Sequence, residues 1–236
     1  MHSPDGSVIV AAMEEEAHNR ARTVPRVRVG AIDDHPVVLR GLMAALVEVA
    51  PDISCDFRVA SLRDVDWDRV TRPDVLLLDI SLNDGSSPED NVRELVARGH
   101  SVLLFTSEER PALLRRLITL GARGLVLKSD ADEALADAIR SVSEGNFATS
   151  SHLAESLLCD DSLVATLSQR EMEVLEALAA GVPKKAIGKT LPDQLSAYTV
   201  DTYFQRIAGR YAALGRPVTN IYGSLREATR DGHLDL

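Results

Sequence analysis

Hydrophobic residues in the first half of the chain form short uninterrupted runs that alternate with stretches of helical spacing. Such runs, bounded by polar residues, predict strands buried on both faces of a parallel sheet. After the first run, apolar residues recur at steps of three and four, which predicts an amphipathic helix opened by Pro36. Asp130 with Glu133 forms a capping-box pattern before the last helix. The alternation over residues 26–145 predicts an α/β domain of five strands and five helices. The clearest runs are Val27–Ile32, Val75–Leu78, Val102–Phe105 and Leu125–Leu127.

The second half of the chain has only helical spacing. Residues 146–166 lack lysine and arginine and contain one amphipathic fragment, His152–Leu158, so we interpret them as a linker. Residues 167–232 are predicted to form a small all-α domain. In this domain Ser168 and Glu171 give a capping-box pattern, and Ser196 can cap a long helix. Residues 1–25 are polar and acidic without periodicity, and we expect them to be a flexible tail.

The composition agrees with this division and limits the function. Of 236 residues, 45% are hydrophobic and only 4% aromatic, as expected for a parallel sheet packed with aliphatic side chains. The net charge of −10 argues against general binding of polyanions. Residues 167–236, with nine basic and eight acidic side chains, are the only segment without an acidic excess. Cys55 and Cys159 form no disulfide framework, no apolar run has membrane-spanning length, and no signal peptide is recognised. We therefore expect a cytoplasmic protein with no membrane partner.

Five polar residues stand where the predicted strands end: Asp33, Asp34, Asp79, Thr106 and Lys128. Ligands of open α/β sheets bind at the carboxyl ends of the strands, so these side chains are expected to meet at one site. Taken singly, each would be read as a turn former, a helix cap or a surface residue. Together, the carboxylates suit Mg²⁺, and the hydroxyl and ammonium groups suit phosphoryl oxygens. Asp79 is the candidate nucleophile that accepts a phosphoryl group.

At these residues the chain resembles a known family. The segments AIDDHPVVLRGL, DVLLLDISLNDGSS, VLLFTSEE and GARGLVLKS resemble the receiver domain of two-component response regulators. LSQREMEVLEALAAG and KKAIGKTL resemble a LuxR-type helix-turn-helix domain, and together they indicate a NarL/LuxR-type response regulator. The resemblance implies a five-stranded parallel sheet in the flavodoxin-like order 2-1-3-4-5, Mg²⁺ as cofactor and a sensor histidine kinase as partner. It also implies Asp79 as phosphoacceptor, Thr106 and Lys128 as the switch pair, and Asp33, Asp34, Asp79 and the carbonyl of Ser81 as metal ligands.

The predicted recognition helix has an apolar stripe and an opposite polar face. The N-terminal part of such a helix reads base edges in the major groove, where Gln205 can bind adenine and Thr202 a thymine methyl. Relatives usually have basic residues at the positions of Asp201 and Gln205, so we expect fewer phosphate contacts here. The predicted DNA-binding residues are Lys184, Lys185, Tyr198, Thr199, Thr202, Gln205, Arg206 and Arg210.

Three functions are compatible with these patterns. The first is a DNA-binding transcriptional regulator switched by aspartyl phosphorylation, which forms a homodimer through its last helix. The second is a phosphorylation-independent regulator controlled by a partner or ligand, since Leu125 replaces the aromatic residue usual three positions before the lysine. The third is a protein-interaction adaptor that no longer binds DNA. An enzyme is not expected, because the chain has no separate catalytic nucleophile and base and no glycine-rich phosphate loop.

Overall fold

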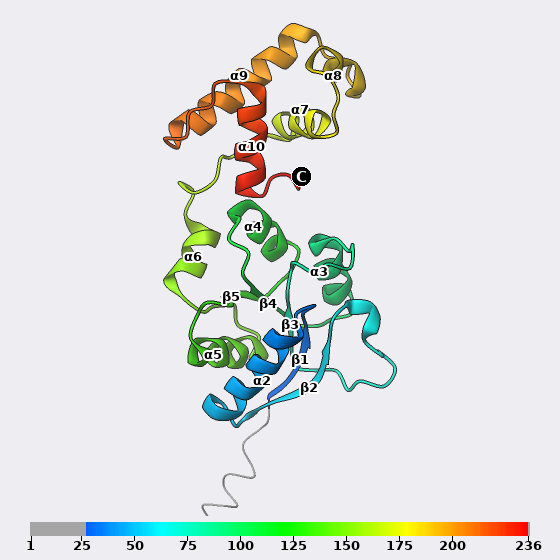
Figure 1. The fold of residues 1–236 in the computed structure, drawn as a ribbon, viewed down its shortest axis with the longest axis vertical. Helices are drawn as coiled ribbons and strands as arrows, with labels where there is room; N and C mark the ends of the chain where they lie inside the picture. The colour runs from blue at the N-terminus through cyan, green and yellow to red at the C-terminus, as the bar shows by residue number, and fades with distance from the viewer. Residues whose placement is uncertain (1–26, 236) are drawn as a thin grey trace, which may run out of the picture.

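The computed structural model describes residues 27–235, and the expected tail at 1–25 lies outside them. The described chain forms a sheet-containing unit and a helical unit, with α4 (Pro111–Thr119) of the first facing α10 (Ile221–Asp231) of the second (Figure 1). No helix within residues 27–235 is long and apolar enough to cross a membrane.

The sheet has six parallel strands in the order β2-β1-β3-β4-β5-β6. The predicted order 2-1-3-4-5 is confirmed, and a short sixth strand is added at the edge. Every residue of β3 and β5 is buried, which explains why these strands appear in the sequence as unbroken apolar runs. The strands are β1 (Val27–Ile32), β2 (Ile53–Val59), β3 (Val75–Leu78), β4 (Val102–Thr106), β5 (Gly124–Leu127) and β6 (Ala148–Thr149).

Helices cover both faces of the sheet. On one face, α3 (Pro88–Ala97) and α4 bury leucines and valines, while α2 (Pro36–Val49) and α5 (Asp132–Ser143) pack on the other. The expected fifth helix of residues 26–145 is wrong: the described connection from β2 to β3 contains only the 3₁₀ turn η1 (Leu62–Asp64). Pro73 disfavours helical backbone in the residue before it. The apolar residues of the segment, Leu62, Val65, Trp67 and Val70, pack on the core but do not follow the three- and four-residue spacing of a helix.

The segment expected to be a linker is partly folded onto the sheet unit. Besides β6 it contains α6 (His152–Cys159), whose Ala154 and Leu157 join the hydrophobic core beside α4. The capping role expected for Asp130 is wrong, since Ala131 is the N-cap of α5 and makes no side-chain hydrogen bond. The Asp130 carboxylate instead accepts hydrogen bonds from the hydroxyls of Ser150 and Ser151, because these lie beside it once β6 pairs with β5.

The helical unit consists of α7 (Gln169–Ala179), α8 (Lys184–Thr190), α9 (Ala197–Ala213) and α10. Its core holds the apolar stripe of α9 against α7 and α8. The capping box of Ser168 and Glu171 is present at the start of α7, and Ser196 caps α9 by accepting a hydrogen bond from the Thr199 backbone. Gly188 lets the turn before α9 pack closely against α8, since a Cβ at position 188 would lie 2.0 Å from the Leu195 carbonyl oxygen.

Candidate phosphoacceptor site and nucleic-acid interface

Three of the predicted site residues form an ionic cluster at the carboxyl edge of the sheet. Asp33 follows β1, Asp79 follows β3 and Lys128 follows β5, so parallel pairing brings them together. The Lys128 Nζ lies 2.7 Å from Asp33 Oδ2 and 2.8 Å from Asp79 Oδ2. Both carboxylates are only 2% exposed. Buried carboxylates in close proximity repel, and the ammonium offsets that repulsion.

Asp34 lies at the outer side of this cluster. Its Oδ2 accepts a hydrogen bond of 2.7 Å from the Asn83 side chain, and its Oδ1 lies 2.8 Å from His35 Nδ1. Burial by itself raises the pKa of Asp34, but hydrogen bonds from Asn83 and the charge of His35 outweigh it and lower the pKa. Sequence reasoning missed His35 and Asn83. Their only signal was proximity in the chain to Asp34 and Asp79.

The cluster has the donors that a hard divalent cation prefers. One ligand atom from each of Asp33, Asp34, His35 and Asp79 lies within 4.8 Å of the others. Asp33 Oδ2 and Asp34 Oδ1 are buried, and the nearest groups to them are the Lys128 ammonium at 2.7 Å and His35 Nδ1 at 2.8 Å. Mg²⁺ typically takes one or two carboxylates, with waters and phosphoryl oxygens completing its shell, so these residues fit it. Ser81 lies beside them, and its backbone N–H donates to Asp79 Oδ1 over 3.3 Å.

Thr106 ends β4 and is fully buried. Its Oγ1 accepts a hydrogen bond of 3.1 Å from the backbone N–H of Glu108, and its carbonyl accepts one from the Lys128 backbone. Leu125, on the neighbouring strand, is also fully buried within the apolar core. The hydroxyl of Thr106 is thus tied to the start of the loop that leads into α4.

A series of ionic contacts continues from this loop to the helical unit. Glu108 Oε2 lies 2.7 Å from Arg110 Nη2, and Arg110 Nη1 lies 2.8 Å from Asp235 Oδ1. Burial alone raises the pKa of Glu108, but hydrogen bonds from Arg110 outweigh it and the pKa is lowered. Further along α4, Arg116 donates to the Gly232 carbonyl oxygen over 2.6 Å. Gly232 ends α10, so α4 holds the last turn of the helical unit.

The predicted DNA-binding residues fall into two groups. Tyr198 is 82% exposed, and Lys185, Gln205 and Arg206 are also exposed, so these side chains are free to contact a ligand. The rest are engaged within the protein. Thr199 Oγ1 is 2.8 Å from the capping Ser196 hydroxyl, and Thr202 Oγ1 donates to the Tyr198 carbonyl.

Two predicted phosphate contacts form ion pairs inside the helical unit. Arg210 Nε lies 3.0 Å from the carboxylate of Glu171, whose side chain is only 1% exposed, so Arg210 fastens α9 to α7. Lys184 Nζ lies 2.6 Å from Asp201 Oδ1. Sequence reasoning expected Lys184 to face DNA and did not foresee that Asp201 binds it.

Known proteins resemble the chain over both units. Residues 165–217 match the family model described as bacterial regulatory proteins, luxR family. The transcriptional regulatory protein DesR of Bacillus subtilis is 31% identical over 171 residues, which cover 72% of this chain and 83% of DesR. The probable transcriptional regulatory protein NarL of Mycobacterium tuberculosis is 30% identical over 224 residues, which cover 89% and 97% of the two chains.

Solved structures that the chain resembles include two response regulators. The response regulator ChrA of a heme-sensing two-component system is 28% identical with a TM-score of 0.50, and the match covers 89% of this chain and 100% of ChrA. RcsB from Salmonella enterica serovar Typhimurium, bound to promoter DNA in the presence of phosphomimetic BeF₃⁻, has a TM-score of 0.62 at 22% identity. That match covers 87% of this chain and 99% of RcsB, and it shows a shared fold.

Proposed function

The chain belongs to the NarL/LuxR-type response regulators, which join a receiver domain to a LuxR-type helix-turn-helix domain, and on that premise we propose that phosphorylation of Asp79 controls its binding to promoter DNA. The family consists of transcription regulators and not of enzymes. The observation that supports the proposal most directly is the Lys128 ammonium, 2.7 and 2.8 Å from two buried carboxylates at the strand ends. In this arrangement the Lys128 ammonium is close enough to pair with a phosphoryl group once Asp79 carries one.

The proposed chemistry is transfer from a phosphohistidine of a sensor histidine kinase. A carboxylate oxygen of Asp79 attacks phosphorus, a P–O bond forms as the P–N bond breaks, and the histidine leaves as imidazole after taking up a proton. Mg²⁺ held by Asp33, Asp34, Asp79 and the Ser81 carbonyl would neutralise charge on the phosphoryl oxygens. Lys128 then pairs with one phosphoryl oxygen, and the Thr106 hydroxyl donates a hydrogen bond to another.

Phosphorylation is proposed to reach the helical unit through the loop before α4. When Thr106 turns its hydroxyl toward the phosphoryl group, it withdraws the acceptor that holds the Glu108 backbone. Glu108 and Arg110 then lose their fixed positions, and with them the contact between Arg110 and Asp235. Release of α10 from α4 frees the helix through which we propose the chain forms a homodimer. The exposed Tyr222 beside the partly buried Ile221 and Leu225 supports pairing through α10.

DNA contacts are assigned to the exposed polar face of α9 and to the start of α8. Tyr198, Gln205 and Arg206 are the candidates for reading base edges, and Lys185 is the candidate for a phosphate contact. A second candidate function is regulation without phosphorylation. The full burial of Leu125 favours it, because no aromatic side chain stands at that position to change orientation.

Selection of genomic DNA fragments by the full-length chain, with and without Mg²⁺ and beryllofluoride, tests the proposal. Enrichment of discrete fragments that depends on beryllofluoride is the expected result. Equal enrichment in both conditions would favour the phosphorylation-independent regulator. No enrichment in either condition would leave the adaptor as the better account, and DNA binding would be withdrawn.

A further inference from the structure

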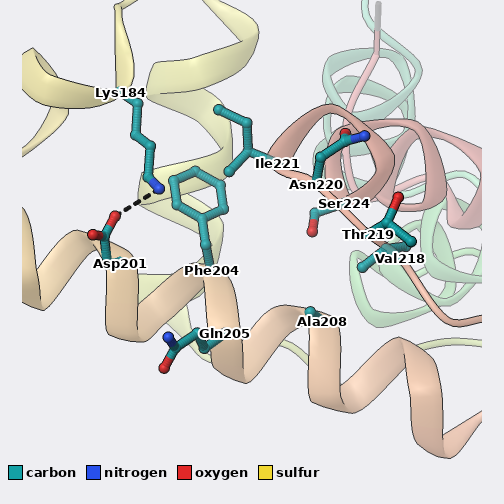
Figure 2. Close-up of a pocket in the computed structure, with 10 residues that line it drawn as sticks. All are labelled: Lys184, Asp201, Phe204, Gln205, Ala208, Val218, Thr219, Asn220, Ile221 and Ser224. Carbon is teal, nitrogen blue, oxygen red and sulfur yellow. Dashed lines mark ion pairs between the residues drawn. The ribbon is translucent and has the colours of Figure 1, made fainter.

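Lys184 and Asp201 form an ion pair at the side of the proposed recognition helix. Lys184 is the first residue of α8, Asp201 lies in the second turn of α9, and Nζ and Oδ1 are 2.6 Å apart (Figure 2). The ammonium also lies 5.8 Å from the ring centroid of Phe204, a core residue of α9. The Asp201 carboxylate and the face of the Phe204 ring therefore both stabilise the ammonium in this position. The pair borders a cavity of about 280 Å³ between α9 and the start of α10.

The ion pair occupies one of the few basic side chains of the helical unit that could otherwise contact a DNA phosphate. Residues 167–235 contain nine basic side chains, and six of them lie within 4.0 Å of a carboxylate. Among the described residues of the unit, only Lys185, Lys189 and Arg206 lack such a partner. Lys184 differs from the other paired cations because its partner lies on the polar side of α9 near its N-terminus, where base reading is proposed.

We propose that Asp201 determines DNA specificity by holding Lys184 away from phosphate; this inference rests on the proposed DNA-binding function. A lysine that neutralises one phosphate releases counterions and strengthens binding to every sequence alike. The carboxylate competes for the same ammonium, so this contact is missing from all complexes. Base contacts by Gln205 and Arg206 are unaffected. The ratio of specific to non-specific affinity is consequently higher than it would be with Lys184 free.

The mechanism differs from simple repulsion between Asp201 and the DNA backbone. The paired carboxylate is already neutralised at 2.6 Å, so the pair as a whole presents almost no net charge to a phosphate. Its side chains are nevertheless 40% and 52% exposed, which means that the ammonium can reach a ligand once the carboxylate is removed. Holding and repulsion therefore make different predictions about where Lys184 lies in the complex with DNA.

Lysine footprinting on the full-length chain with Mg²⁺ and beryllofluoride separates the two mechanisms. The chain has only four lysines, and Lys128 of the sheet unit, which is partly buried and far from the helical unit in sequence, serves as an internal reference. In the native chain, random-sequence duplex DNA should protect Lys185 from acetylation and leave Lys184 as reactive as in the free protein. In Asp201→Asn, the DNA should protect both. Glu176→Gln, which removes an exposed carboxylate from α7, should behave as the native chain.

Binding measured by fluorescence anisotropy provides the second readout. Asp201→Asn should raise affinity for random DNA about threefold and steepen the slope of log affinity against log salt by about 0.9, the value for one added phosphate contact. In the Lys184→Met background the same substitution should change the slope by less than half as much. Protection of Lys184 in the native chain, or equal slope changes in both backgrounds, would overturn the proposal. If no variant binds any DNA, the proposed function itself fails, and the inference falls with it.

Discussion

Replacing Gly232 by alanine should separate the two units without phosphorylation. Gly232 ends α10 with φ of 86°, and a Cβ at this position would lie 2.8 Å from Arg110 Cβ and 3.0 Å from the Leu113 backbone nitrogen. Those atoms are fixed to the backbone of α4 and cannot rotate away. The new methyl group therefore forces α10 to move off α4.

The size of the effect follows from the contacts that are lost. A hydrogen bond from a charged donor, as between Arg116 and the Gly232 carbonyl, contributes about 1.5–3 kcal/mol. The partly exposed pair of Arg110 and Asp235 contributes about 0–1 kcal/mol. Loss of both shifts the equilibrium toward separated units by about 1.5–4 kcal/mol, or roughly tenfold or more. Strain from the left-handed backbone adds about 1–2 kcal/mol to the cost of the alanine itself.

Gly181→Ala provides a matched control for that strain. Gly181 follows α7 with φ of 79°, and a Cβ there would meet nothing within 4 Å. Both variants are compared by hydrogen exchange of α4 and by limited proteolysis of residues 160–167, which contain no helix or strand. Only Gly232→Ala should expose α4 and accelerate cleavage, and beryllofluoride should add little further change. Equal behaviour of the two variants, or unchanged exchange in α4 of Gly232→Ala, would refute the proposed contact between the units.

Three further predictions concern the sheet unit. Incubation with acetyl phosphate and Mg²⁺ should add one base-labile phosphate, and mass spectrometry should detect none on Asp79→Asn; a labelled variant would mean that another residue is the acceptor. Asp34→Asn should weaken Mg²⁺ binding severalfold in a titration, whereas equal affinity would place the metal elsewhere. Hydrogen bonds from Ser61 and Ser86 lower the pKa of Asp84 from its ordinary value of 3.8 to about 2. Because the folded-state pKa is depressed, the stability that the ionised carboxylate contributes is present above pH 3.8 and is lost as the pH falls toward about 2. Asp84→Asn should therefore flatten the dependence of the free energy of unfolding on pH between these values. An unchanged pH dependence in the variant would contradict the assignment.

Much of the sheet unit could be predicted because β3 and β5, and most of β4, are buried on both faces. Burial requires unbroken apolar runs, and the polar residue that follows each run must then lie at the carboxyl edge of a parallel sheet. This explains why the convergence of Asp33, Asp79 and Lys128 could be anticipated from residues 46 and 49 positions apart. The missing helix between β2 and β3 shows the limit. The number of strands and the length of the chain between two of them do not determine whether that connection forms a helix or only a 3₁₀ turn.

Side-chain partners between elements could not be predicted, because they depend on how helices pack. Asp201 and Lys184 are on different helices, and so are Arg210 and Glu171, so helical periodicity says nothing about their contact. Asp130 illustrates the same point. Its local sequence favours a helix cap, but the hydroxyl of Ser150, brought near by β6, competes successfully for the carboxylate.

The burial of Leu125 has a consequence for how a signal would leave the proposed phosphoacceptor site. A leucine packed in the core has no polar tip that could exchange a buried position for an exposed one, so it cannot report the state of Asp79. Thr106 can report that state, because its hydroxyl accepts a hydrogen bond from the Glu108 backbone and can donate one to a phosphoryl oxygen. The Glu108 backbone N–H donates to that hydroxyl, and the Glu108 carboxylate accepts hydrogen bonds from Arg110. Arg110 in turn donates to Asp235 near the end of the described chain. Control of the helical unit would then depend on polar contacts along one loop, and it requires no aromatic side chain at position 125.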